Sequence, residues 1–206
     1  MGRRFAELAF TPLVKEQQKL HGSRHLYERV ENSNNLGDRL GPDEQAFIRE
    51  RDGFYMASVN ETGWPYIQFR GGPAGFLHVL DESMLGFADL RGNRQYVSTA
   101  NLQYDDRVAL FFMDYPNQSR LKILGRVKVY EGTEKAQELI EKLRMANERT
   151  PPERAMLIHV EAFDWNCQQH ITPRYSEAEL AKMLEPMRKR LEFLEQANSR
   201  RREAAE

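Results

Sequence analysis

The chain has 206 residues, of which 40% are hydrophobic and 30% charged, enough for one domain with a substantial core. Positive and negative side chains nearly cancel to a formal net charge of −1. That balance argues against a dedicated nucleic-acid-binding protein, because such proteins need a basic excess. Cys167 is the only cysteine in the sequence, so an intramolecular disulfide and a multi-cysteine metal site are excluded.

The apolar segments of the sequence indicate whether the protein is inserted into a membrane or secreted. The longest strongly apolar run, residues 108–113, is far too short to span a bilayer. The N-terminus contains acidic residues and lacks the long apolar region of a signal peptide. We therefore expect a cytoplasmic protein that makes no membrane contact.

The sequence divides into three segments. Residues 1–50 are predicted to be a charged helical extension, with one helix beginning at Pro42 because proline and acidic residues occupy its first turn. Residues 51–165 form the predicted core domain. Residues 166–206 contain a loop and a last helix that begins near Ser176, where Ser-Glu-Ala-Glu makes a capping box. Pro186 is expected to kink or restart that helix.

The core segment has the periodicity of β-strands. Apolar or alternating runs bounded by turn residues cover residues 54–60, 64–70, 76–80, 84–88, 107–113 and 121–129. An amphipathic helix is predicted over residues 133–147, followed by a further strand-like run over residues 155–162. The pattern predicts a mainly β (α+β) fold: a closed or nearly closed antiparallel barrel of six strands with flanking helices.

One polar stretch, "FADLRGNRQYVSTANL" over residues 87–102, joins a predicted strand to a predicted helix. A helix that begins near Asn93 would direct free backbone N–H groups beyond the strand end, where they could bind an anion. Arg94 would lie in the first turn, where the helix dipole disfavours a cation unless an anion is bound. The alternative is an ordinary capped helix with Arg94 paired to Asp89 or Asp105. Spacing alone leaves both interpretations open.

Three further stretches carry candidate binding residues. Gln68 and Arg70 share one strand face and are followed by glycines that open the strand end; a solvated edge strand is the alternative. Two cations enter a later strand at residues 119–122, where surface charges are the commoner explanation. "DWNCQQHITPR", residues 164–174, could stack on a planar cofactor or could simply anchor the chain before the last helix.

No metal site or cysteine nucleophile is predicted. His21 and His25 have the spacing of a metal-binding pair, but no third ligand accompanies them. Cys167 has no base at a spacing that would mark it as a nucleophile.

Four strings together carry a family resemblance: "GWPYxQxRGGPxGF", "GFADxRGNRQYxSxxNL", "MDYP…RLKILGR" and "DWNCxQHITPR". With them the chain resembles a bacterial subgroup of the pyridoxamine 5′-phosphate oxidase-like superfamily of FMN-binding split barrels. The resemblance implies a six-stranded split barrel over residues 51–165 and a homodimer with FMN sites at the subunit interface. Residues 166–206 would complete the dimer and the flavin site.

The resemblance also implies roles for individual residues. Residues of the second and fourth strands would contact the flavin, and the family's phosphate-binding triplet aligns with residues 93–95. The second subunit would supply Trp165, with two further candidates from the same loop. The implied cofactor-binding set is Gln68, Phe69, Arg70, Gly71, Phe87, Ala88, Asn93, Arg94, Gln95, Arg120, Lys122, Trp165, His170 and Arg174.

The sequence departs from the family pattern at several positions. Gln95 replaces a lysine of the phosphate triplet, for which Arg120 or Lys122 could substitute, and Pro73 replaces the lysine that binds the vitamin phosphate. The C-terminal Arg-x-His substrate motif is missing, and Gln168 replaces the proline usual in the subgroup. Pro73 and the missing C-terminal motif argue against pyridoxamine 5′-phosphate oxidation, whereas no function is attached to Gln168.

The sequence therefore favours an FMN-dependent oxidoreductase acting on an unidentified small molecule or electron donor, with FMN preferred to FAD. One alternative is a flavin-binding store or sensor without turnover. Another is a split barrel that uses haem, with His170 as the first candidate ligand, or a deazaflavin.

Overall fold

The computed structural model describes residues 1–146, 149–165 and 169–203. Its N-terminal segment contains α1 (Arg3–Ala9), α2 (Pro12–Leu20), α3 (Arg24–Glu31) and α4 (Pro42–Arg49). The predicted helix start at Pro42 is confirmed. There the backbone N–H of Gly41 donates to the Glu44 carboxylate at 2.9 Å, which satisfies a group that a helix N-terminus would leave free.

The core is an antiparallel sheet of β1 (Gly53–Val59), β2 (Pro65–Gly71), β3 (His78–Val79), β4 (Met84–Leu90), β5 (Arg107–Asp114), β6 (Ser119–Tyr130) and β7 (Pro152–Trp165). The strand order is β2-β1-β5-β6-β7-β4-β3. The sheet thus has seven strands where the sequence predicted six, because the run after the 133–147 helix forms the long strand β7, which pairs with both β6 and β4. No ladder joins β2 to β3 among the described strands, so hydrogen bonds do not close the sheet into a barrel.

The sheet nevertheless curls around an aromatic core. The ring of Phe54 on β1 lies 5.7 Å from that of Phe87 on β4, although three strands separate β1 from β4 in the sheet order. Phe54 also stacks on Phe76 at 5.8 Å and on Phe112 at 5.3 Å. Alternate side chains of β1, β5 and β6 fill this core, as the period-two pattern of residues 121–129 predicts. The curl brings the ends of β2 and β4 close together.

Two further helices pack against the sheet, in addition to α1 and α4. α5 (Val97–Tyr104) follows β4, and α6 (Glu134–Leu143) lies between β6 and β7. The Thr133 hydroxyl caps α6 by accepting from the backbone N–H of Ala136 at 3.2 Å. The helix ends at Leu143 rather than at the predicted residue 147, because Arg144 takes an extended conformation; residue 147 itself lies outside the described part of the chain.

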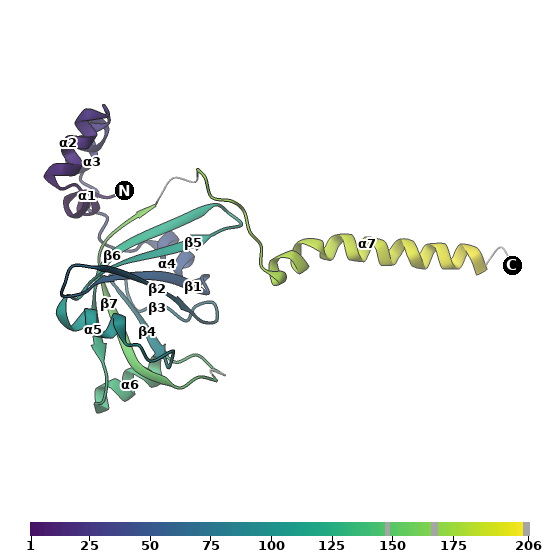
Figure 1. Cartoon of the computed structure of the whole chain (residues 1–206). Helices are drawn as coiled ribbons and strands as arrows, with labels where there is room; N and C mark the ends of the chain where they lie inside the picture. Colours follow the sequence, from purple (N-terminus) through teal and green to yellow (C-terminus); the bar gives the residue numbers. More distant parts are fainter. Residues whose placement is uncertain (147–148, 166–168, 204–206) are drawn as a thin grey trace.

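The last helix, α7 (Glu177–Glu203), extends away from the sheet domain (Figure 1). Its predicted capping box is present: the backbone N–H of Ser176 donates to Glu179 at 2.7 Å, and that of Glu179 donates to the Ser176 hydroxyl at 3.3 Å. The helix does not restart at Pro186 but runs through it. Among the described helices, none has the length and apolarity needed to cross a membrane.

Candidate anion-binding pocket and outer groove

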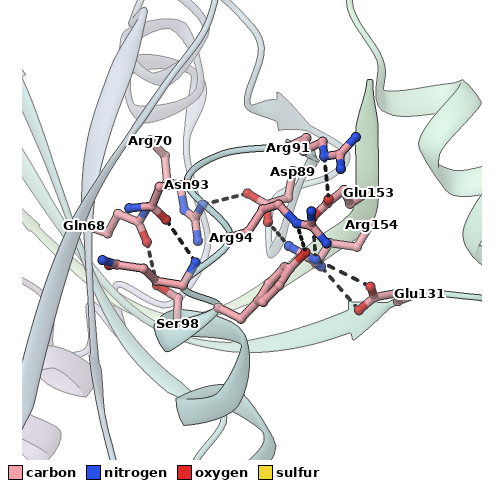
Figure 2. Close-up of polar contacts among 12 residues, drawn as sticks. Gln68, Arg70, Asp89, Arg91, Asn93, Arg94, Ser98, Glu131, Glu153 and Arg154 are labelled. Atoms are coloured by element: carbon pink, nitrogen blue, oxygen red, sulfur yellow. Dashed lines mark hydrogen bonds and ion pairs between the residues drawn. The ribbon is translucent and has the colours of Figure 1, made fainter. Parts of the chain in front are cut away.

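A polar pocket lies where the ends of β2 and β4 meet the segment that leads into α5 (Figure 2). Gln68 and Arg70 enter it from β2, and Asn93, Arg94 and Gln95 enter it from the segment between β4 and α5. Arg154, at the start of β7, forms part of its wall. The structure therefore brings together five of the residues that the sequence proposed for cofactor binding.

Asp89 organises the floor of this pocket. Its two carboxylate oxygens accept hydrogen bonds from Arg70 Nη1 at 2.7 Å and from Arg154 Nη1 at 2.8 Å (Figure 2). The Asp89 and Arg154 side chains are almost fully buried. Burial by itself lowers the pKa of Arg154, but hydrogen bonds to Glu131 and Asp89 and their negative charges raise that pKa above its usual range. Arg154 is therefore charged, and its pairing with Asp89, like that of Arg70, holds the guanidinium group in place.

Arg70 has a hydrogen-bond donor without a partner. Its Nε atom is buried, and none of the described residues accepts a hydrogen bond from it. An unsatisfied buried donor costs about 1–3 kcal/mol, and more for a charged group. A ligand anion in the pocket would remove that cost. The pocket therefore fits a group that accepts hydrogen bonds and carries negative charge.

The segment before α5 differs from its prediction. A helix beginning at Asn93 is wrong, since α5 begins at Val97. Arg94 (φ 61°) and Tyr96 (φ 55°) both take the left-handed conformation, which an α-helix cannot include, and the Asn93 side chain accepts from the backbone N–H of Gln95 at 3.1 Å. Asn93 thus stabilises a turn of its own. The N-cap residue of α5, Tyr96, makes no capping hydrogen bond with its side chain.

Arg94 makes neither of the ion pairs that an ordinary surface arginine was expected to make here. Asp89 is taken by two other arginines, and Asp105 accepts from Arg107 Nε at 2.8 Å. The Arg94 guanidinium is exposed, and its Nε lies 3.4 Å from the hydroxyl of Tyr96. The ring of Tyr96 in turn lies 5.3 Å from the guanidinium of Arg154. Arg94 thus lies at the pocket without a salt bridge to any carboxylate in the described part of the chain.

Several other proposed residues lie near the pocket without lining it. Phe87 belongs to the buried core, and Ala88 is buried beside it on β4, one residue before Asp89. Phe69 points to the opposite face of β2 and packs on Tyr55, with ring centroids 5.4 Å apart. Gly71 ends β2, where an added Cβ would lie 2.7 Å from the Phe69 ring. Phe87 thus packs in the core, whereas Phe69 is 56% exposed on the other face of β2.

A second group lines a groove of about 700 Å³ on the outer face of the sheet. Its walls are mostly apolar and come from β1, β2, β5 and β6. Arg120, Lys122, His170 and Arg174 supply its basic side chains. Lys122 is paired with Asp164 at 2.9 Å, whereas Arg120 Nε is buried and meets no acceptor in the described part of the chain. This groove also has a donor available to a ligand.

Trp165 belongs to neither group. Its indole N–H donates to Glu44 at 2.6 Å, and its ring lies edge-on to Phe47 at 4.8 Å. These contacts attach the end of β7 to α4. Cys167 and Gln168 lie outside the described residues.

Arg154, Tyr96, Ser98 and Glu153 also line the pocket, and the sequence did not propose them. Arg154 was placed before the strand, which was expected to begin at residue 155. In β7 it shares the buried face with Met156 and Ile158. The alternation of Arg154 with the apolar Met156 and Ile158 was the sequence signal that could have indicated a buried arginine. Ser98 donates to the side-chain oxygen of Gln68 at 3.0 Å and so joins α5 to β2.

The structure is thus an antiparallel curled sheet with an arginine-rich pocket at its strand ends. Residues 40–167 match the family model described as pyridoxamine 5′-phosphate oxidase. The chain therefore belongs to the pyridoxamine 5′-phosphate oxidase family. No curated protein matches the sequence.

Solved structures of low sequence identity are also similar to the chain. One is HupZ from Group A Streptococcus, 14% identical, covering 66% of this chain and 99% of its own, with a TM-score of 0.49. Another, from Clostridium acetobutylicum, is a protein related to general stress protein 26 (14% identity, 63% and 88% coverage, TM-score 0.46). A third is an FMN-binding protein from Syntrophomonas wolfei (11% identity, 72% and 97% coverage, TM-score 0.43).

Proposed function

We propose that the chain binds FMN as a homodimer, with the FMN phosphate in the polar pocket, and that it is an FMN-dependent oxidoreductase acting on a small molecule. The observation that carries this proposal is the buried Nε of Arg70, which has no acceptor among the described residues and borders a pocket that Arg94 and Arg154 also line. Membership of the pyridoxamine 5′-phosphate oxidase family supports it.

The charges of the pocket suit a dianionic phosphate. Asp89 neutralises part of the charge of Arg70 and Arg154, while Arg94 forms no salt bridge with a carboxylate among the described residues. Arginine binds phosphate oxygens through several directed donors, and the first turn of α5 adds backbone N–H groups. Gln95 brings no charge where the family has lysine. Within one chain, Arg154 supplies a nearby cation, because Arg120 and Lys122 line the outer groove instead.

The arrangement of β2 supports a site shared between two copies. Gln68 and Arg70 point to the polar pocket, whereas Ile67 and Phe69 point to the opposite face, where the outer groove lies. Because neighbouring side chains of a strand point to opposite faces, one chain does not present both sets to one side. A second copy would bring Arg120, Lys122, His170 and Arg174 to the flavin.

When bound, FMN supplies hydride acceptance at its ring. The residues of the chain hold the phosphate through Arg70 and Arg94, orient the ribityl chain through Gln68, and shield the ring with the apolar walls of the groove. Groove cations close to the ring would favour its reduced, anionic form. The carboxylates among the described lining residues of the pocket, Asp89 and Glu153, are both paired with arginines, so neither is free to act as a general base.

The phosphate assignment is tested by comparing FMN with riboflavin, which lacks the phosphate. Arg94→Ala should weaken FMN binding about tenfold or more, the loss of one charge-assisted hydrogen bond, and leave riboflavin binding unchanged. Arg107→Ala, which removes an exposed arginine outside the pocket, serves as the matched control. Flavin fluorescence measures both affinities. Equal losses for FMN and riboflavin would contradict the assignment.

Turnover is tested separately. The purified protein should be yellow, with FMN as the mass-identified released ligand, and should consume reductant faster than free FMN does. A colourless protein that binds neither FMN nor FAD contradicts the proposal. Tight FMN binding without excess consumption indicates a store or sensor. A Soret band would instead indicate a haem protein, and a deazaflavin as the released ligand would indicate a deazaflavin-dependent one.

A further inference from the structure

α7 is a long helix whose apolar side chains are exposed to solvent. Every residue from Glu177 to Arg200 is exposed except Ala197, which is half-buried. The helix carries seven large apolar side chains with exposed fractions between 43% and 68%: Leu180, Met183, Leu184, Met187, Leu191, Phe193 and Leu194. Figure 1 shows α7 extending beyond the sheet domain. Helices gain most of their stability from packing of an apolar face, so this face calls for a partner.

The spacing of these side chains identifies the kind of partner. Leu180, Leu184, Met187, Leu191 and Leu194 follow one another at intervals of four, three, four and three residues. That period of 3.5 is the heptad repeat of a coiled coil, in which the helices pack along positions a and d. Leucines 184 and 191 take position a, and residues 180, 187 and 194 take position d. We call these five residues the heptad seam.

The remaining residues are compatible with this seam. Pro186 and Phe193 both fall at position c, on the outer side of the helix, so the proline ring does not enter the seam. Asn198 falls at the next position a. A single asparagine at position a is the device by which two-stranded parallel coiled coils fix their register, because the two amides hydrogen-bond to each other.

We propose that α7 is a self-association arm, in which the helices of two copies of this chain form a parallel coiled coil along the heptad seam. Charge complementarity favours a second copy. Arg190 at position g faces Glu195 at position e of the other helix, and symmetry gives this pair twice. An antiparallel pair that aligned Leu191 with Leu194 would place Asn198 against Met187 and leave its amide unsatisfied.

The coil is short, so its strength depends on how the two copies are otherwise joined. Pairing of the sheet domains would hold the helices at a high effective concentration and make a weak coil form. The proposal does not depend on flavin binding, and a colourless protein would leave it intact.

Cysteine cross-linking tests the parallel register in the full chain. Cys167→Ser removes the only cysteine, and Asn198→Cys then places one thiol at position a. Mild oxidation should join two chains through this residue, because position-a residues face each other in a parallel pair. Gln196→Cys, at the outer position f, is the matched control and should stay uncross-linked. A failure at residue 198, or equal cross-linking at both positions, would overturn the proposal.

A second measurement tests the seam itself. Leu191→Glu places a carboxylate in the seam, whereas Phe193→Glu removes an equally apolar side chain on the outer face of the same turn. Leu191→Glu should raise the dimer dissociation constant at least tenfold in sedimentation equilibrium, because two like charges would be buried together. Phe193→Glu should leave the constant unchanged. Equal constants for the two variants would defeat the assignment.

Discussion

At the scale of single residues, Asp89 holds the anion pocket in shape. It accepts hydrogen bonds from Arg70 and Arg154, and all three side chains are buried or nearly so. Asp89→Asn should lower the free energy of unfolding by roughly 3–5 kcal/mol, because Arg70 loses the carboxylate it is paired with and the buried Arg154 keeps only Glu131 and Glu153. Urea unfolding without ligand measures this loss. Asp105→Asn, which breaks the pair with the exposed Arg107, is the control and should change stability by less than about 1 kcal/mol.

Asp105 also makes a prediction about acid stability. Hydrogen bonds from the Arg107 side chain and backbone lower the pKa of Asp105 to about 2, from 3.8. A carboxyl group whose folded pKa is depressed stabilises the fold above its unfolded pKa, and this contribution is lost as pH falls through the folded value. The small difference in free energy of unfolding between the natural protein and Asp105→Asn should therefore decrease as the pH falls from 4 to 2. Unfolding curves at several pH values measure it; a gap that widened on acidification would contradict the sign.

At the scale of elements, the sequence predicted the segments with a regular hydrophobic period and missed the irregular ones. Period-two runs located the strands, and local motifs located the start of α4 and the Ser176 capping box. The segment 92–96 was misassigned because Asn93 favours a helix cap and a turn equally, and left-handed residues leave no periodic signal. Arg154 was missed because its burial depends on the distant Asp89 and Glu131. Pairing across 65 residues cannot be read from local pattern.

The conformation of this segment reverses the usual ranking of glycine and alanine. Arg94 has a φ of 61°, which glycine adopts without the steric penalty that a Cβ incurs. Arg94→Gly should therefore be more stable than Arg94→Ala by about 1 kcal/mol. In a helical turn, alanine would instead be the more stable by about the same amount. Thermal or urea unfolding of the two variants decides between the conformations. Both variants should lose FMN affinity equally, because both lack the guanidinium.

At the scale of the whole molecule, the polar pocket and the outer groove lie on opposite faces of β2, an edge strand. Each contains an arginine with a buried donor and no described acceptor, Arg70 in one and Arg120 in the other. A two-fold assembly that set the groove of one copy against the pocket of the other would give both donors a shared ligand. A site shared between two chains can be distinguished from a site within one chain by mixing two variants.

Chains with Arg94→Ala and chains with Arg174→Ala should each bind FMN weakly, since every site then lacks one contact. Arg174 is the better choice for the second variant, because it lies over Tyr115 in the groove, whereas Trp165 anchors β7 to α4. In a heterodimer of the two variants, one site carries both substitutions and the other carries none. Mixed dimers, isolated through two different affinity tags, should therefore recover one tight FMN site per dimer. Fluorescence titration gives the stoichiometry. Recovery of no tight site would place Arg94 and Arg174 in the same chain's site or in different sites, and so contradict the shared arrangement.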